Sequence, residues 1–228
     1  MRSLRLALVA LCLIAGSAIA SPADPKNGAE YLTLQTPQPV QAAGNKVEVI
    51  EFFMYHCPHC NSLEPELAAW VKQQGDKIVF RRVHFPFSGP MDPEAHLYLT
   101  LEAMGKLDTL HDKVFYAIHA EHKRLSSDEA VFEWAVKNGL DKAKFLEFWN
   151  SFGVLTKMKR LKAIVEAYKV DSAPTLIVDG KYMTSPAMVG GANPSMPGNL
   201  TLKSAVQTLD ALVTKVQKEK SATKPAGK

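Results

Sequence analysis

The chain has 228 residues, of which 46% are hydrophobic and 22% charged, and its formal net charge is +4 at pH 7. This composition is ordinary for a folded protein and argues against a fibrous or disordered chain. The near-balanced charge, without basic clusters in the folded part, leaves no electrostatic footprint for nucleic acid. A chain of this length buries one substantial core, or a core with an inserted subdomain.

The first twenty residues have the pattern of a secretory signal peptide. Arg2 and Arg5 precede an apolar run over residues 6–14, and Ala-Ile-Ala at residues 18–20 is the small-x-small pattern of a cleavage site. A membrane anchor is the alternative, but the run is shorter than the ~20 residues that a bilayer-spanning helix needs. We therefore expect export, with cleavage after Ala20.

The next part of the chain predicts strands around one helix. A short edge strand is expected at residues 31–34, and a continuous apolar strand at residues 46–53. Such an apolar strand is usually central and covered on both faces. A helix over residues 61–74, with Pro58 near its first turn, leads to a strand over residues 78–83. The right-handed crossover rule makes the two strands that flank this helix parallel.

Helical periodicity then runs through residues 91–168, where Ser126 and Glu129 form a capping box at one helix start. Strand signals return in residues 175–183 as a hairpin with a two-residue Asp179-Gly180 turn. The chain therefore carries an all-helical block between its strand-rich parts.

A loop over residues 190–197 and a C-terminal helix over residues 202–216 follow the hairpin. The element order predicts an α/β fold, a small mixed sheet flanked by helices, with an inserted all-helical subdomain. The insertion and the sheet are expected to form a cleft with two cysteines at its edge. The chain divides into a signal peptide (1–20), a first sheet segment (21–90), the helical insertion (91–168), a second sheet segment (169–218) and a flexible tail (219–228).

Cys57 and Cys60 are the cysteines that remain after removal of the signal peptide, which contains Cys12. They enclose Pro58 and His59 at the point where the central strand gives way to the helix. Export places the pair in an oxidising compartment, where disulfides persist. A bridge that closes so short a loop removes little chain entropy, so the spacing favours a working disulfide over a structural one.

The motif suits sulfur chemistry because the reactive species in thiol–disulfide exchange is the thiolate. Cys57 at a helix N-terminus gains at most ~2 kcal/mol from the helix dipole, which is about one and a half pKa units. A strongly acidic thiol needs more. We expect the positive charge or N–H donor of His59 to tip the motif toward an oxidant.

A zinc-binding site is the alternative interpretation of this motif, since His56, Cys57, His59 and Cys60 are all possible ligands. Zinc usually takes two ligands from a second, distant knuckle, and the chain shows no such partner pair. We therefore expect no metal site. The remaining histidines share no chemically meaningful spacing and are expected in scattered surface or capping roles: His84, His96, His111, His119 and His122.

Two further segments complete a family pattern. Glu51-Phe52-Phe53 precedes the Cys57–Cys60 motif, and Ala173-Pro174-Thr175 precedes the hairpin, with the helical insertion between them. With these segments the chain resembles the DsbA-type periplasmic thiol:disulfide interchange proteins of the thioredoxin superfamily, over roughly residues 31–216. The resemblance implies a thioredoxin-like fold, a monomer and no cofactor beyond the cysteine pair.

The resemblance also implies a direction of flow and partners. The protein would donate disulfides to reduced, unfolded exported proteins in the periplasm. A quinone-linked membrane oxidase of the DsbB type would then reoxidise it. Three apolar residues in turns or loops are candidates for a groove that holds such substrates: Phe85, Phe87 and Met188.

Residue roles follow from the same resemblance. Cys57 would be the exposed sulfur that substrates attack, and Cys60 the buried sulfur that recaptures Cys57 from stalled mixed disulfides. Pro174 would be cis and pack against the cysteines, leaving the Ala173 backbone to pair with substrate chains. Ala173 departs from the bulkier valine or threonine common there, which leaves redox tuning and substrate preference open.

Glu51 is an acid within an apolar strand, which is costly unless the group is paired or protonated. The resemblance implies a buried carboxylate that helps move the proton of Cys60. The alternative is a solvent-facing glutamate beside Arg81 or Arg82. Because these arginines alternate faces, only one of them can reach Glu51.

Two other functions remain open on the sequence alone. A periplasmic reductase or isomerase of the same fold would use the same motif. A chaperone-like or zinc-binding module would carry the cysteines without turnover.

Overall fold

The computed structural model of the protein describes residues 22–223, so the expected signal peptide and the end of the tail lie outside the described residues. Five strands form one mixed sheet in the order β1-β5-β4-β2-β3. Their bounds are β1 Tyr31–Thr33, β2 Val47–Phe53, β3 Ile78–His84, β4 Thr175–Val178 and β5 Tyr182–Thr184. As predicted, β2 is an interior strand, between β4 and β3, that is buried along its whole length and parallel to β3, and β1 is an edge strand.

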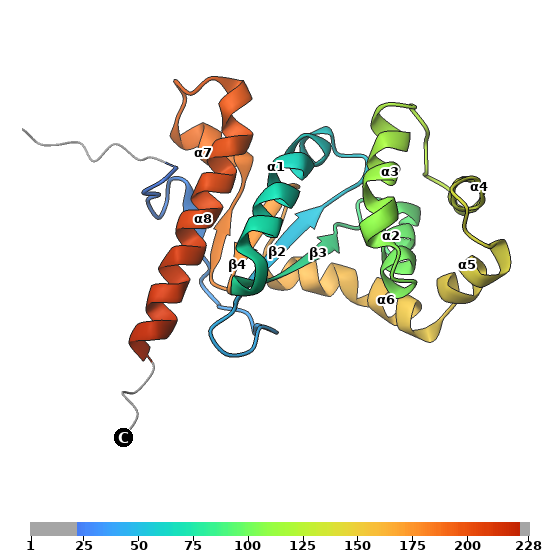
Figure 1. The fold of residues 1–228 in the computed structure, drawn as a ribbon, viewed down its shortest axis with the longest axis horizontal. Coiled ribbons are helices and arrows are strands. Elements are labelled where there is room, and N and C mark those ends of the chain that lie inside the picture. The colour runs from blue at the N-terminus through green and yellow to red at the C-terminus, as the bar shows by residue number, and fades with distance from the viewer. Residues whose placement is uncertain (1–21, 224–228) are drawn as a thin grey trace, which may run out of the picture.

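The helices lie on both sides of this sheet and at one end of it. Figure 1 shows α8 and α1 side by side over the sheet, with α2 to α5 grouped beyond its far end and α6 returning beneath. Within the described chain no helix is both long and apolar enough to span a bilayer. The helix bounds are α1 Pro58–Gln74, α2 Pro93–Ala103, α3 Leu107–His119, α4 Asp128–Lys137, α5 Lys142–Trp149, α6 Phe152–Ala167, α7 Pro186–Ala192 and α8 Gly198–Thr223, with a 3₁₀ turn at Gly75–Lys77.

Alternation along β2 sorts its side chains into two cores. Val47 and Val49 pack in the core that α1 and α8 share. Ile50 and Phe52 pack in the larger core, which continues through α6 into the other helices of the insertion. By the same alternation Glu51 falls on the side of α1, so the strand itself delivers a carboxylate to the region beneath the cysteines.

Two helix starts differ from the sequence prediction. The N-cap of α4 is Ser127, whose Oγ accepts the N–H of Ala130 (3.3 Å), and not Ser126, so the expected capping box is one residue out of register. The expected loop over residues 190–197 is partly wrong, because α7 occupies its beginning. Ser185 caps this helix and Pro186 supplies a preset first turn, which offset the poor helix propensity of its glycines.

The hairpin loop is one residue longer than expected, although the expected Asp179-Gly180 turn is present: both residues have a positive φ, and the Lys181 N–H donates to the Val178 carbonyl (3.0 Å). Val178 pairs with Tyr182, so residues 179–181 form a three-residue loop. The carbonyl of Lys181 accepts the N–H of Leu34 (2.7 Å), which is just beyond β1. Lys181 thus lies outside the β4–β5 register and bonds instead to the segment that follows β1.

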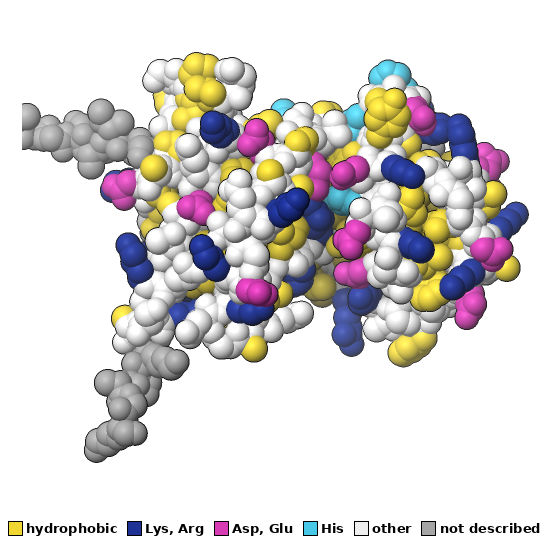
Figure 2. Space-filling view, in the orientation of Figure 1, with side chains coloured by type: hydrophobic (Ala, Val, Ile, Leu, Met, Phe, Trp, Pro, Cys, Tyr) yellow, Lys and Arg dark blue, Asp and Glu magenta, His cyan; other side chains and the backbone are white. Residues whose placement is uncertain are grey.

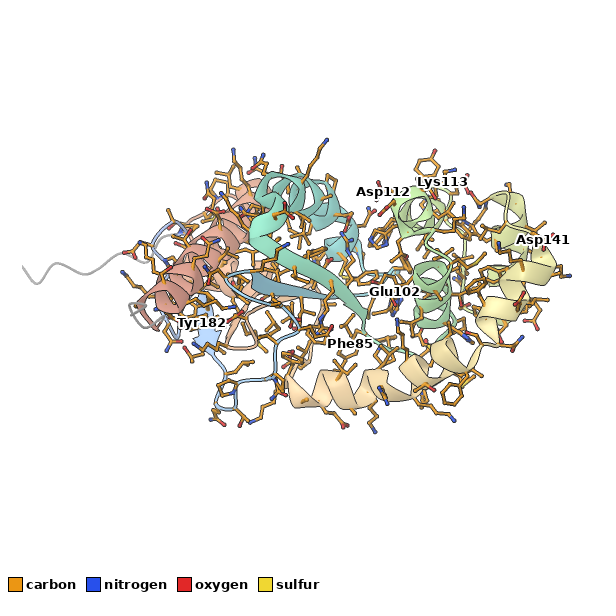
Figure 3. The ribbon with its side chains drawn as sticks, turned by 60° about the horizontal axis from the view of Figure 1, so that its bottom comes forward. Phe85, Glu102, Asp112, Lys113, Asp141 and Tyr182 are labelled. Carbon is orange, nitrogen blue, oxygen red and sulfur yellow. The ribbon has the colours of Figure 1, made fainter. Side chains whose placement is uncertain are left out.

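The C-terminal helix is longer than expected. The Tyr182 hydroxyl donates to Glu219 (2.6 Å), and Lys220 donates to Asp179 (2.6 Å). Figure 3 shows Tyr182 at the end of the sheet that α8 covers. The helix α8 therefore continues past residue 218, and contacts with the hairpin hold this following turn in place.

Candidate active site

Cys57 is the N-cap of α1, with Pro58 at the first helical position, where a missing N–H costs no helical bond. The Cys60 N–H donates to Cys57 Sγ (3.4 Å). Both cysteines are free thiols; Cys57 retains 6% of its surface and Cys60 none. Of the two sulfurs, only Cys57 is placed for attack from solution.

The second family segment lies directly against Cys57. The Ala173–Pro174 peptide bond is cis, as expected. The Cys57 thiol donates to the carbonyl oxygen of Ala173 (3.4 Å), which joins residues 116 positions apart in the chain. The structure therefore brings the dithiol and the segment ahead of β4 into one site.

The Cys57 thiol is acidic. Its pKa is lowered to about 6, first by the hydrogen bond with the Cys60 side chain; burial opposes this shift, and the N–H groups of Cys60 and His59 lower the pKa further. The charge of His59 contributes in the same direction but less than these bonds. Because the His59 side chain is exposed, water screens its charge, so our expectation that His59 is the decisive residue is corrected.

Cys60 behaves in the opposite way. Its pKa is raised, first by the hydrogen bond to Cys57 and then by burial. The two sulfurs therefore favour different protonation states. Cys57 is stable as a thiolate at neutral pH, whereas Cys60 keeps its proton.

Beneath Cys60, Glu51 is fully buried and paired with the arginine opposite it on β3. Arg82 Nε donates to Glu51 Oε2 (2.8 Å), and Arg82 Nη2 donates to Glu64 Oε1 (2.5 Å). Burial raises the pKa of Glu51 to about 7, although Arg82 opposes the shift. The solvent-facing alternative for Glu51 is thus excluded, and Arg82 is the arginine that reaches it.

Arg81 lies on the other face of β3, where its Nε is 3.4 Å from Glu48 Oε1. Sequence reasoning missed Glu64. Its signal was available, because Glu64 follows Cys60 by four residues and so lies on the same face of α1.

The prediction of scattered surface roles for the histidines is wrong for three of them: His84, His96 and His111 are all buried. His111 Nδ1 is 2.9 Å from the Tyr55 hydroxyl, and its Nε2 is 3.5 Å from Glu64 Oε2. Burial lowers the pKa of His111 to about 3 and that of His84 to about 4, so both are neutral. These histidines lie on separate elements that meet only in the folded structure, so their spacing in the sequence could not predict that they are buried.

Acidic and histidine side chains gather at the boundary between α1 and the helices α2 and α3, as Figure 2 shows. Within residues 22–223, however, no group of three or more His, Cys, Asp or Glu side chains is arranged to hold a metal ion.

The three apolar residues predicted to form a substrate groove differ in exposure: Phe87 is 68% exposed, whereas Phe85 and Met188 are half-buried. Phe85 lies between the sheet and the insertion (Figure 3).

A thioredoxin-like sheet, an acidic thiol capping a helix and the carbonyl of Ala173 against that thiol define a thiol:disulfide oxidoreductase. A profile described as DSBA-like thioredoxin domain matches residues 93–196, and the thiol:disulfide interchange protein DsbA of Burkholderia cepacia is 39% identical over 213 residues, covering 93% of this chain and 96% of that protein. The chain belongs to the DsbA family.

Other relatives agree with this assignment. The thiol:disulfide interchange protein DsbA of Bordetella parapertussis is 41% identical over 184 residues, which are 80% of this chain and 87% of that protein. The crystal structure of Pseudomonas aeruginosa DsbA has a TM-score of 0.74 at 35% identity and covers 86% of this chain and 96% of that one. The similarity thus extends over both sheet segments and the helical insertion.

Proposed function

We propose that this protein is a periplasmic oxidase that donates its Cys57–Cys60 disulfide to newly exported proteins. The observation that carries the proposal is the low pKa of Cys57, held by hydrogen bonds at the N-terminus of α1. Interactions that stabilise the thiolate favour the reduced form over the disulfide. They therefore make the disulfide a stronger oxidant.

The reaction has two exchanges. A substrate thiolate attacks Cys57 Sγ of the disulfide, the bond between the enzyme sulfurs breaks, and Cys60 leaves and takes up a proton. A second substrate thiolate then attacks the substrate sulfur of the mixed disulfide and expels Cys57 as a thiolate. Two electrons pass from the substrate dithiol to the enzyme, and a good leaving group of pKa about 6 favours this second exchange.

Glu51 is the group that we assign to the proton of Cys60. Its pKa of about 7 lets it both accept and release a proton at neutral pH, and its charge acts on Cys60. Arg82 and Glu64 hold it in place. When Cys60 leaves as a thiolate in a buried site, a proton from this position prevents an unpaired buried charge.

Ala173 and Pro174 form the substrate-binding side of the site. The contact of the Ala173 carbonyl with Cys57 puts the backbone of this segment where an extended substrate chain can pair beside the reacting sulfur. The exposed ring of Phe87 offers apolar surface nearby, next to His56. Such surface suits unfolded chains, which expose apolar side chains.

The wider setting belongs to the same proposal. The signal-peptide pattern supports cleavage after Ala20 and a periplasmic location. The reduced pair needs an oxidant, and a quinone-linked membrane oxidase of the DsbB type fits that need. The protein uses no cofactor other than its cysteines and acts as a monomer. Residues 91–168 are an insertion between two sheet segments, residues 21–90 and 169–218. Residues 219–228 follow as a tail whose first turn extends α8.

Oxidative refolding of a reduced substrate protein tests the catalytic role. The Cys57→Ala variant should lose the acceleration completely, because no sulfur remains for attack. Equal refolding with this variant would instead support a chaperone-like module. A Cys60→Ala variant should trap mixed disulfides through Cys57, and mass spectrometry of the trapped partners would identify the substrates.

A further inference from the structure

His56, the residue before Cys57, is tied to the helical insertion. Its Nδ1 lies 2.7 Å from Glu94 Oε2, and its backbone N–H donates to the same oxygen (3.1 Å). Glu94 lies in the first turn of α2 and is buried. One carboxylate of the insertion thus fixes both the backbone and the ring of the residue next to the reactive sulfur.

The surroundings of His56 favour its cationic form. Asp92, the N-cap of α2, accepts the N–H of Glu94 (3.0 Å) and adds a second negative charge. His84 Nε2 lies 3.9 Å from Glu94 Oε2, but burial lowers the pKa of His84 to about 4, so it is neutral and does not compete for that carboxylate. The Phe87 ring also lies beside His56, with its centroid 5.1 Å from that of the imidazole, and it carries no charge.

The pKa of His56 is raised, first by its hydrogen bond to Glu94, and the charge of Cys57 acts in the same direction. Attraction of this kind is mutual, so a protonated His56 also favours the Cys57 thiolate. The His56 side chain is 34% exposed and held in one place, whereas the His59 side chain is exposed. Its charge is therefore less screened by water than that of His59.

We propose that His56, clamped by Glu94, is a positioning residue that provides a fixed cation for the Cys57 thiolate, so that the helical insertion helps to set the oxidising power of the dithiol. The inference deepens the proposed oxidase function and rests on it. The contribution has a definite pH dependence. It is present below the raised pKa of His56 and is lost as the pH rises through that value.

His56→Gln tests the cation. Titration of the thiolate by its ultraviolet absorbance should show a higher pKa for Cys57, and the equilibrium with glutathione should shift roughly threefold to tenfold toward a less oxidising dithiol. His56→Phe keeps an aromatic ring against Phe87 and should behave like the glutamine variant. The matched control is His122→Asn, which removes an exposed histidine of the insertion at a positive φ that asparagine tolerates.

Glu94→Gln tests the clamp. The amide keeps an acceptor for the His56 N–H but removes the charge that holds the ring protonated. In this background, replacing His56 by glutamine should have little further effect on the Cys57 titration at neutral pH. The same replacement should keep an effect in mildly acidic solution, where an unassisted histidine is still protonated.

Two results would overturn the proposal. One is a His56→Phe variant with the thiolate titration and glutathione equilibrium of the unchanged protein, which would show that the ring matters and the charge does not. The other is a shift of equal size in His122→Asn. Failure of the unchanged protein to oxidise a reduced substrate would reject the oxidase function itself, whatever the His56 variants show.

Discussion

Cys57 and Cys60 occupy one helical turn, yet their protons are held very differently. The Cys57 sulfur accepts hydrogen bonds from N–H groups at the start of α1, whereas Cys60 is buried and donates a hydrogen bond to Cys57. At the scale of single residues, the chemistry follows from this asymmetry. Glu51 adds a carboxyl group that titrates near neutrality directly below the pair.

The acidity of Cys57 predicts how the stability of the reduced protein changes with pH. The pKa of Cys57 is depressed to about 6, so its contribution to folding is fully present above the ordinary thiol pKa and is lost as the pH falls through about 6. The unfolding free energy of the reduced protein, relative to that of the oxidised protein, should rise by about 1.4 kcal/mol per pH unit from pH ~6 to ~8. Denaturant unfolding of both forms measures it, and a pH-independent difference would contradict the assignment.

Glu51→Gln should slow thiol–disulfide exchange about tenfold or more at neutral pH, because Cys60 loses its proton donor and acceptor. The titration of Cys57 should change much less. Glu48→Gln is the matched control, since Glu48 is a buried acid on the same strand that pairs with Arg81 on the other face. Equal slowing in both variants would indicate a general effect on the sheet. Stopped-flow kinetics with a reduced peptide provides the rates.

At the scale of elements, alternation and capping rules predicted most of what positions the site. The apolar run of β2, the crossover to β3 and the start of α1 follow from local pattern, and so does the placement of Cys57 at a helix N-terminus. The hairpin forms its predicted Asp179-Gly180 turn but has one more loop residue than expected: Lys181 lies outside the β4–β5 register, and its carbonyl accepts the N–H of Leu34 from another segment. Such tertiary contacts leave no local signal.

Gly180 shows the same dependence on distant chain. Its φ is +64°, and a Cβ there would lie 2.2 Å from the backbone oxygen of Gln38. Gly180→Ala should therefore destabilise the protein by more than the ~1–2 kcal/mol that a left-handed conformation alone costs a side chain. Gly139→Ala is the control, since Gly139 also has a positive φ but open space around it. Comparable losses of unfolding free energy in the two variants would show that the clash is relieved without cost.

At the scale of the whole molecule, the sheet supplies the dithiol and the helical insertion supplies its surroundings. The fold class and the insertion could be predicted from the order of elements. The insertion's role at the site could not, because Glu94 and His111 reach the site through packing of helices remote in sequence. Glu64 was within reach of helical periodicity, whereas the buried histidines were not.

The central claim is that this dithiol is an oxidant, and its reduction potential tests that claim most directly. The protein is equilibrated with glutathione buffers of graded ratio, and the reduced fraction is quantified after acid quenching and thiol alkylation. We predict a potential tens of millivolts above the ~ −270 mV of thioredoxin. A value at or below that of thioredoxin would contradict the oxidase function and would favour a reductase of the same fold.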